Sequence, residues 1–276
     1  MFNLMFITNN KEIAQYAVNC GVNRIFLDTE ILGKKKRQGH LDTVISEHLL
    51  SDIATLKEVE GNFELLVRIN PLYDGTDGEI EEAISLGADI IMLPMFQSEN
   101  EVETVSKMIR GRVKFIPLVE TCSAIDLIEK IAQVKGVSEL HIGLNDLHLD
   151  MNLDFMFELF ENGVVEQAAN TLKKNGVPFG IGGVAKLGGG LLPADLILSE
   201  HVRLGSTGAI LSRAFHSKSV SLNELKKNID LEAEVAKLRD YIRYVSGKNA
   251  HFLSQNTNRL NVIVRDVVKE MHEKNI

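Results

Sequence analysis

The sequence has little cysteine, no excess of positive charge and no long hydrophobic run. Its two cysteines, Cys20 and Cys122, are too few for a disulfide framework, which favours a reducing cytosol as the compartment. The apolar N-terminal stretch MFNLMFITNN lacks the basic start and the small-residue cleavage site of a signal peptide, and no apolar run is long enough to cross a membrane. We therefore expect a cytoplasmic protein whose first residues form a strand.

The charge balance excludes some classes of partner. A formal net charge of −8 argues against nucleic acid or an anionic membrane as the main partner. A small substrate with a phosphate or carboxylate remains compatible, because a site can be locally positive. The 276 residues are 45% hydrophobic and 25% charged, which is ordinary for a soluble globular protein with one large α/β domain or two small ones.

A recurring phrase predicts the fold. Each time, a helical pattern ends at a glycine, a small or β-branched residue follows, and an apolar strand begins. The glycines concerned are Gly21, Gly87, Gly136 and Gly176. Glycine after a helix adopts the left-handed conformation that ends the helix. Apolar runs without clean alternation are typical of strands buried on both faces, so the phrase predicts repeated βα units and a parallel sheet.

Eight apolar segments predict eight strands with helical patterns between them. They are Leu4–Thr8, Ile25–Asp28, Leu65–Ile69, Ile90–Met95, Phe115–Glu120, Leu140–Gly143, Phe179–Gly182 and Arg203–Leu211. Eight βα units match a closed (β/α)8 barrel, or TIM barrel, and a doubly wound open sheet is the alternative. We expect the α/β barrel to span residues 1–218 and to act as the catalytic domain.

The remaining residues, 219–276, have a purely helical pattern. The predicted helices are Leu222–Ile229, Leu231–Val245 and Leu260–His272. Their apolar residues exceed what one face of a barrel needs. We therefore expect this extension either to cap the barrel or to reach across to another subunit.

Two carboxylates follow neighbouring strands inside the stretch Val113–Asp150. Glu120 ends the apolar run Phe115–Val119, and Asp146 follows Leu140–Ile142. The carboxyl ends of parallel strands meet on one side of the sheet, where the active site of a barrel lies. A pair of carboxylates suits Mg²⁺ or Mn²⁺, which keep positions for water and substrate. The alternative is that each acid caps the helix after it.

Arg68 lies within an otherwise apolar strand, so its guanidinium must be paired or must face the site. The functional interpretation is a fork that holds a carboxylate or a developing oxyanion. The structural interpretation is an ion pair with an acid of a neighbouring strand, for which Glu30 is a candidate. We favour the functional interpretation.

Two further motifs carry weaker signals. The basic loop Leu32–Asp42 contains His40, a possible acid–base group, and could attract an anionic substrate or part of a CoA nucleotide; a solvated loop is the alternative. The segment Gly180–Ala185 matches the dinucleotide pattern G-x-G-x-x-A, but it follows the seventh strand, so a crowded barrel rim explains it more simply.

Four phrases in one order carry a family resemblance. They are Val67–Asn70, Gly87–Met95, Val119–Thr121 and Ile142–Leu147. With them the chain, from about Arg24 to Phe215, resembles the HpcH/HpaI aldolase and citrate lyase β-subunit family of the phosphoenolpyruvate/pyruvate barrel superfamily. The resemblance implies a lyase that makes or breaks a carbon–carbon bond next to a carbonyl of a 2-oxo acid.

The resemblance also implies roles for particular residues. Glu120 and Asp146 would bind Mg²⁺ or another divalent ion. Arg68 would stabilise the enolate oxygen, and backbone amides near Gly143 and Asn145 would hold the carboxylate of the substrate. Members of the family often form trimers or hexamers through C-terminal helices, so a homo-oligomer is expected.

The chain departs from both branches of this family after the second strand. The aldolase branch has a Glu-His pair there, whereas Ile31 follows Glu30 in this chain. The CoA-lyase branch has Asp-x-Glu-Asp, of which only Asp28-Thr29-Glu30 is kept. The acid–base group is then His40, Glu30, Asp77 or the substrate itself. The alternatives to a 2-oxo acid lyase are a CoA-ester lyase and a non-catalytic binding barrel.

Overall fold

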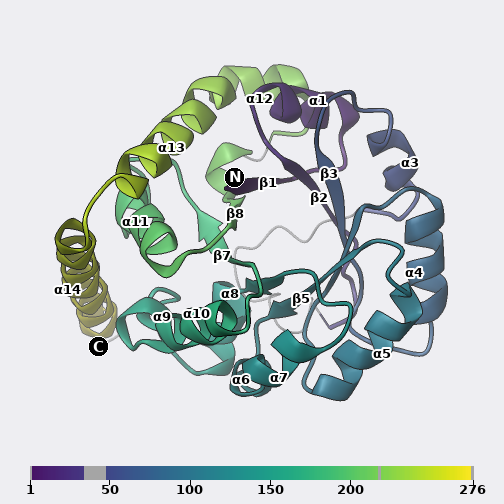
Figure 1. Cartoon of the computed structure of the whole chain (residues 1–276). Coiled ribbons are helices and arrows are strands. Elements are labelled where there is room, and N and C mark those ends of the chain that lie inside the picture. The colour runs from purple at the N-terminus through teal and green to yellow at the C-terminus, as the bar shows by residue number, and fades with distance from the viewer. Residues whose placement is uncertain (1, 34–47, 217–218, 275–276) are drawn as a thin grey trace.

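The structure is a computed structural model that describes residues 2–33, 48–216 and 219–274. Its strands form a closed parallel barrel in chain order, and β8 pairs with β1 (Figure 1). The strands are β1 (Asn3–Ile7), β2 (Arg24–Asp28), β3 (Glu64–Arg68), β4 (Ile90–Leu93), β5 (Lys114–Val119), β6 (Leu140–Ile142), β7 (Phe179–Val184) and β8 (Gly208–Leu211). The predicted TIM barrel is confirmed, and the open sheet is wrong.

Helices surround the barrel and join successive strands (Figure 1). Those between β1 and β6 are α1 (Lys11–Asn19), α3 (Asp52–Leu56), α4 (Thr76–Ser85), α5 (Glu99–Ile109), α6 (Cys122–Asp126) and α7 (Ile128–Gln133). Those after β6 are α8 (Leu144–Asp150), α9 (Glu158–Glu161), α10 (Val164–Lys174), α11 (Ala194–Leu204) and the 3-10 helix η1 (Arg213–Phe215). All four glycines of the recurring phrase have positive φ, between 68° and 107°.

One predicted boundary is wrong. Arg203 and Leu204 end helix α11 rather than begin a strand, and β8 begins only at Gly208. Gly205 ends the helix with φ +80°, so the recurring helix–glycine–strand phrase occurs here as well. The apolar Val202 and Leu204 belong to the helical pattern that precedes this glycine.

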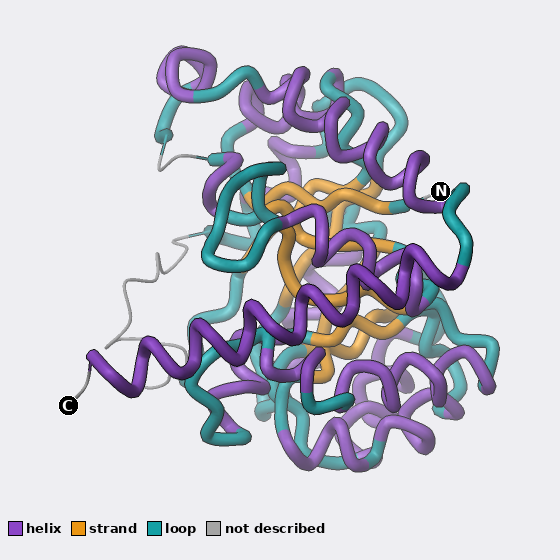
Figure 2. Tube along the Cα trace, turned by 90° about the vertical axis from the view of Figure 1, so that its left-hand side faces the viewer, coloured by secondary structure: helices purple, strands orange, loops and turns teal. Residues whose placement is uncertain are grey.

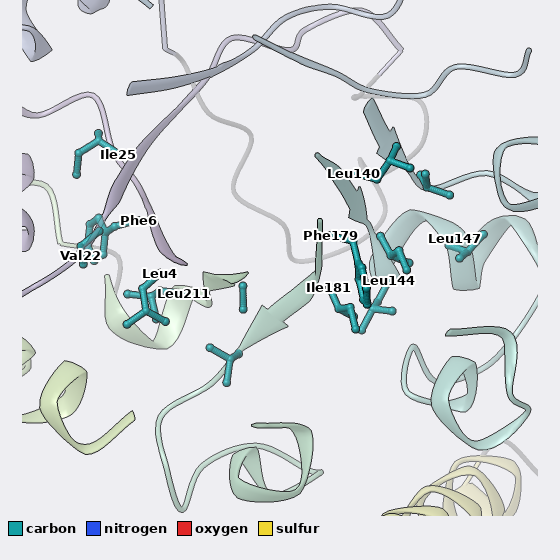
Figure 3. Packing of buried hydrophobic residues seen from close by; sticks show 14 of the residues in the cluster. Leu4, Phe6, Val22, Ile25, Leu140, Leu144, Leu147, Phe179, Ile181 and Leu211 are labelled. Carbon is teal, nitrogen blue, oxygen red and sulfur yellow. The ribbon is translucent and has the colours of Figure 1, made fainter. Parts of the chain in front are cut away.

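The strands are apolar throughout because both of their faces are covered. One set of side chains fills the inside of the barrel: Met5, Phe26, Leu66, Ile90, Met92, Ile116 and Leu118. The alternate side chains pack outward against the helices. Figure 3 shows part of this outer layer, where Leu140, Phe179 and Ile181 of the strands meet Leu144 and Leu147 of α8. The carboxyl ends of the strands are thereby held rigidly, which is what a site there requires.

The C-terminal helices are α12 (Leu222–Asn228), α13 (Leu231–Ser246) and α14 (Ala250–Lys274). α12 packs on α1, α13 on α11, and α14 on α11 and α9, along the outside of the barrel (Figure 2). Arg239 of α13 donates hydrogen bonds to the carbonyls of Phe2 and Gly21, at the amino ends of β1 and β2. The boundary at residue 218 and a contact with another subunit stay predictions. In the described chain, no helix is long and apolar enough to span a membrane.

Candidate active site

A cavity of about 950 Å³ lies at the carboxyl ends of the strands. Its lining includes the predicted site residues Arg68, Glu120, Gly143, Asn145 and Asp146. They come from the ends of β3, β5 and β6, which the barrel brings together across a sequence distance of almost eighty residues. The cavity is close to the upper end of the about 300–1,000 Å³ that is typical of small-molecule sites.

Arg68 is both paired and exposed to the cavity. Its Nε and Nη2 groups donate to the two carboxylate oxygens of Asp28, at 2.9 and 2.8 Å, and Glu30 Oε2 lies 3.4 Å from Nε. Burial opposes the charge of the guanidinium, but Asp28 and Glu30 raise the pKa of Arg68 above that of an ordinary arginine. Within the described residues, no hydrogen bond of Nη1 is found, so this group remains for a ligand.

Glu120 follows β5 and is buried. Its Oε1 accepts a hydrogen bond of 3.1 Å from the backbone N–H of Met95, which has a φ of 54°. A left-handed backbone is strained for a residue other than glycine, and such strain gathers at functional sites. The capping alternative is wrong for Glu120, because the side chain of Thr121 caps α6 instead, accepting from Ala124 N–H at 3.1 Å.

Asp146 lies in the first turn of α8, and the N-cap residue of this helix, Gly143, lies against Glu120. No side chain caps this helix, because its N-cap residue is Gly143. A Cβ atom at Gly143 would lie 3.0 Å from both Cβ and Oε2 of Glu120. A glycine is therefore what allows the start of α8 to approach the carboxylate so closely. An acid in the first turn interacts favourably with the helix dipole. Stabilisation of α8 is therefore a role of Asp146 that is compatible with its position.

The electrostatics of the site are unbalanced. Burial, with the nearby carboxylates of Asp146 and Glu30, raises the pKa of Glu120 to about 8, although Arg68 acts in the opposite direction. Arg68 and the acids Asp28, Glu30, Glu120 and Asp146 form a group that we call the acid cluster. With every member ionised, the acid cluster, counted over the described residues alone, has one positive and four negative charges. A divalent cation would reduce its net charge from −3 to −1.

The donor set fits a hard divalent cation that is bound by two protein carboxylates. Among the described residues, no group of three or more His, Cys, Asp or Glu side chains is arranged as a metal site. A cation held by the two carboxylates Glu120 and Asp146 would keep most of its positions for water and substrate oxygens. Mg²⁺ and Mn²⁺ bind in this way.

The structure separates the candidates for an acid–base group. Asp77 is exposed at the start of α4 and does not line the cavity. Glu30 is buried beside Arg68 and is not part of the cavity wall. His40, with all of the loop Leu32–Asp42 except its first two residues, lies outside the described residues. The amides of Ile31 and Leu32 both donate to Asn70 Oδ1 at 2.9 Å, which fixes where this loop leaves β2.

The glycine segment after residue 179 forms strand β7, not a nucleotide-binding turn. A Cβ atom at Gly180 would lie 2.3 Å from Nδ1 of His141, and one at Gly182 would lie 2.6 Å from Leu144. The dinucleotide interpretation is therefore wrong. These glycines allow close packing at the crowded inner wall of the barrel.

Three features of the site were not identified from the sequence. Asp28, rather than Glu30, is the main partner of Arg68; its position at the end of β2 was the available signal. The backbone N–H of Met95 binds Glu120, which no sequence pattern reveals. His48 lines the cavity, and its Nδ1 accepts from the backbone N–H of Asp28 at 3.1 Å. His48 has no cluster spacing with other histidines, so only the fold could place it.

Several solved structures share the fold of this chain. An HpcH/HpaI aldolase from Desulfitobacterium hafniense has a TM-score of 0.62 and 14% identity, and the match covers 83% of this chain and 93% of that one. A family protein from Burkholderia cenocepacia gives 0.60 and 14%, covering 88% and 94%. The citrate synthase SbnG gives 0.59 and 15%, covering 87% and 93%.

At such identities these structures establish the fold alone, and no curated protein matches the sequence significantly. The family profile is more informative. The profile described as HpcH/HpaI aldolase/citrate lyase matches residues 5–177, which includes every strand end that contributes to the acid cluster. This chain therefore belongs to the HpcH/HpaI aldolase/citrate lyase family, a family of lyases.

Proposed function

We propose that this protein is a divalent-metal-dependent carbon–carbon lyase of the class II aldolase type. It acts next to the carbonyl of a 2-oxo acid such as pyruvate. The observation that carries this proposal is the acid cluster, in which Arg68 and the carboxylates of Asp28, Glu120 and Asp146 line one large cavity and Glu30 lies buried beside Arg68. Such a cluster favours a bound cation, and the pair of cation and arginine favours negative charge that develops on a substrate oxygen.

The residues that would hold the ion are Glu120 and Asp146. When bound there, Mg²⁺ or Mn²⁺ supplies Lewis-acid stabilisation of a carbonyl oxygen. Arg68 is held by Asp28 at two of its nitrogens and presents Nη1 to the cavity. It is therefore positioned to donate to the oxygen that becomes negative when a proton leaves the carbon next to the carbonyl.

In the direction of bond formation, the methyl carbon of the 2-oxo acid loses a proton and attacks the carbonyl carbon of an aldehyde. The aldehyde oxygen takes up a proton and becomes a hydroxyl. One proton leaves and one is gained, so the reaction needs no oxidant, reductant or other co-reactant. The uncapped start of α8, from Gly143 to Asn145, is where we propose that the substrate carboxylate binds.

Exchange of the methyl protons of pyruvate with solvent deuterium tests this proposal without an acceptor. We expect exchange, followed by NMR, to require Mg²⁺ or Mn²⁺ and to stop with EDTA. Glu120→Gln and Asp146→Asn should lose exchange by at least about 10²-fold, since each removes charge that holds the ion. Glu232→Gln, an exposed acid of α13, is the matched control and should retain wild-type exchange.

A binding measurement separates the two ways in which this test can fail. Calorimetric titration with Mn²⁺ should show one site in the wild type and none in Glu120→Gln. If both variants bind Mn²⁺ as the wild type does, the assignment of the metal ligands is wrong. If Mn²⁺ binds but pyruvate does not exchange, the barrel binds ligands without enolising pyruvate.

We also propose that the chain forms a homo-oligomer, a trimer or a hexamer, through its C-terminal helices. Tyr244 of α13 and Val262 of α14 support this, because each exposes more than half of a large apolar side chain, 52% and 55%. Light scattering during size-exclusion chromatography measures the number of subunits. A monomer at micromolar concentration would contradict this proposal.

A further inference from the structure

The cavity is much larger than the acid cluster needs, and its remaining wall differs in chemistry. Loops after β6, β7 and β8 contribute a surface that we call the outer apolar wall. Its members are Phe155, Met156, Phe157, Leu191, Leu192 and Val220. The acid cluster lies at the ends of β2, β3, β5 and β6, so most of the outer apolar wall, the part after β7 and β8, covers the other side of the barrel mouth.

Two side chains of this wall are exposed to an unusual extent. Leu191 is 68% exposed and Val220 is 77% exposed, the two highest fractions among the large hydrophobic residues that the structure describes as exposed. Both line the cavity, one from the loop after β7 and one from the loop after β8. Apolar side chains that are kept at the rim of a substrate cavity are suited to contact an apolar part of a ligand.

Four neutral polar side chains on this side of the cavity are already engaged within the protein, and the basic Arg213 and His216 line it as well. Asn9 Nδ2 donates to Asp52 at 2.9 Å, and Asn10 Oδ1 accepts from Ile13 N–H at 3.0 Å. Ser212 Oγ accepts from Ala214 N–H at 3.3 Å, and Ser219 Oγ accepts from Asn228 Nδ2 at 3.1 Å. A ligand with many hydroxyl groups would have to compete for these groups, whereas an apolar ligand would leave them undisturbed.

We propose that the acceptor in this reaction is an aldehyde with an apolar tail, aliphatic or aromatic, that lies against the outer apolar wall. This inference rests on the proposed function and specifies its second substrate. The three-carbon 2-oxo acid occupies the acid cluster. The aldehyde carbonyl meets it there, and the tail extends past Leu192 toward Leu191 and Val220.

A series of aldehydes tests the inference with the metal-loaded enzyme and pyruvate. From propanal to hexanal, we expect kcat/KM to increase by up to about four-fold for each added methylene, which is the full transfer of one methylene from water to an apolar site. Glyceraldehyde and erythrose test aldehydes with hydroxyl groups. Succinic semialdehyde tests an aldehyde with an anionic tail, which the exposed Arg213 at the same rim could contact. A higher kcat/KM for any of these three than for pentanal overturns the inference.

The double variant Leu191→Asn, Val220→Asn tests the wall itself. Both side chains are exposed, so the fold should tolerate the change. We expect kcat/KM for hexanal to fall about ten-fold, with acetaldehyde addition and pyruvate exchange unchanged. Val262→Asn on α14, an apolar position that is 55% exposed and lies outside the cavity, is the control and should leave hexanal addition unchanged.

Pyruvate exchange without an acceptor distinguishes the two levels of failure. Exchange without a preference for apolar aldehydes, or an unaltered preference in the double variant, overturns this inference and leaves the proposed function intact. No metal-dependent exchange overturns the proposed function, and this inference with it.

Discussion

The two ends of the β2–β3 pair contain the same ion pair in opposite orientation. In the register of the barrel, Arg24 lies opposite Glu64 at the amino ends, and Asp28 lies opposite Arg68 at the carboxyl ends. Arg24 also forms two hydrogen bonds of 2.9 Å with Glu139, across the barrel. Each arginine is thus bound to a carboxylate through two nitrogens.

The two ends differ in what surrounds the pair. At the amino end, Arg24 is 3% exposed, and Lys114 joins Glu64, so two cations meet the two acids Glu64 and Glu139. At the carboxyl end, Arg68 lines a cavity, and the part of the chain that the structure describes places one cation beside four acids. A paired arginine is therefore not evidence of a structural role by itself. Charge imbalance and access to a cavity separate a site from a buried clamp.

Replacing each arginine by lysine tests this difference, and the largest effect is expected at Arg68. Arg68→Lys keeps the charge but loses the fork, so a single ammonium must serve both Asp28 and the substrate. We expect metal-dependent pyruvate exchange to fall about 10²–10³-fold, as for loss of an oxyanion donor. NMR exchange rates measure this, and thermal unfolding should show that the variant is folded. Exchange within three-fold of the wild type would mean that Arg68, like Arg24, has only a structural role.

Arg24→Lys should instead reduce the stability of the protein and leave pyruvate exchange unchanged. It loses at least one charge-assisted hydrogen bond in a buried network, worth about 1.5–3 kcal/mol of unfolding free energy. The melting temperature should fall by several degrees, at about 2–4 °C per kcal/mol in a protein of this size. Pyruvate exchange at 20 °C should be retained. Denaturant unfolding and exchange on the same sample check both outcomes, and a large loss of exchange would contradict the comparison.

The sequence was sufficient for the barrel because several independent signals agree. The sequence repeats the same order of helical pattern, left-handed glycine and buried strand along the chain. An error in one boundary, such as the start of β8, therefore does not change the predicted topology. The carboxyl ends of the strands then place Arg68, Glu120 and Asp146 at one mouth. The resemblance to the family added the chemistry that these residues would perform.

The details of the site depend on distances that no pattern encodes. The choice of Asp28 over Glu30 as the partner of Arg68 is decided by register, since β2 and β3 place residue 28 beside residue 68. The N–H of Met95 reaches Glu120 only because the backbone turns left-handed after β4. His48 lies beside Asp28 at the end of β2 although twenty residues separate the two in the sequence, so no local pattern indicates their contact. The outer apolar wall likewise combines residues from three loops.

Proton and metal should compete for Glu120, which gives a moderate effect that depends on pH. Its folded pKa of about 8 exceeds the ordinary 4.5, so the metal-free folded protein keeps a proton that the unfolded chain has lost. This contribution to stability is complete below pH 4.5 and is lost as the pH rises through about 8. A bound divalent ion replaces the proton, so the increase in melting temperature with Mn²⁺ should be larger at pH 8.5 than at pH 7.

The range from pH 7 to 8.5 is chosen so that two buried histidines do not contribute. Burial lowers the pKa of His141 to about 4 and that of His201 to about 3, so both change stability only in acid. Differential scanning fluorimetry with Mn²⁺ or EDTA measures the effect. In Glu120→Gln the dependence of the Mn²⁺ shift on pH should disappear. A wild-type shift that is equal at both pH values would mean that Glu120 does not hold the ion.

The smallest expected effect concerns the close approach of α8 to Glu120. Gly143→Ala places a methyl group 3.0 Å from Glu120 Cβ and Oε2 and 3.2 Å from Leu118. The φ of −87° suits alanine, so the backbone is not strained, and the side chains of Glu120 and Leu118 must shift instead. We expect Mn²⁺ affinity to fall about ten-fold with a loss of unfolding free energy of about 1–2 kcal/mol. Gly78→Ala on α4 is the control: a Cβ there meets no atom within 4 Å, and helix propensity predicts slight stabilisation with unchanged Mn²⁺ affinity. If Gly143→Ala binds Mn²⁺ as tightly as this control, Mn²⁺ affinity does not depend on the position of Glu120 relative to α8. The carboxyl end of the barrel would then resemble the structural ion pairs of the amino end more closely than its charges indicate.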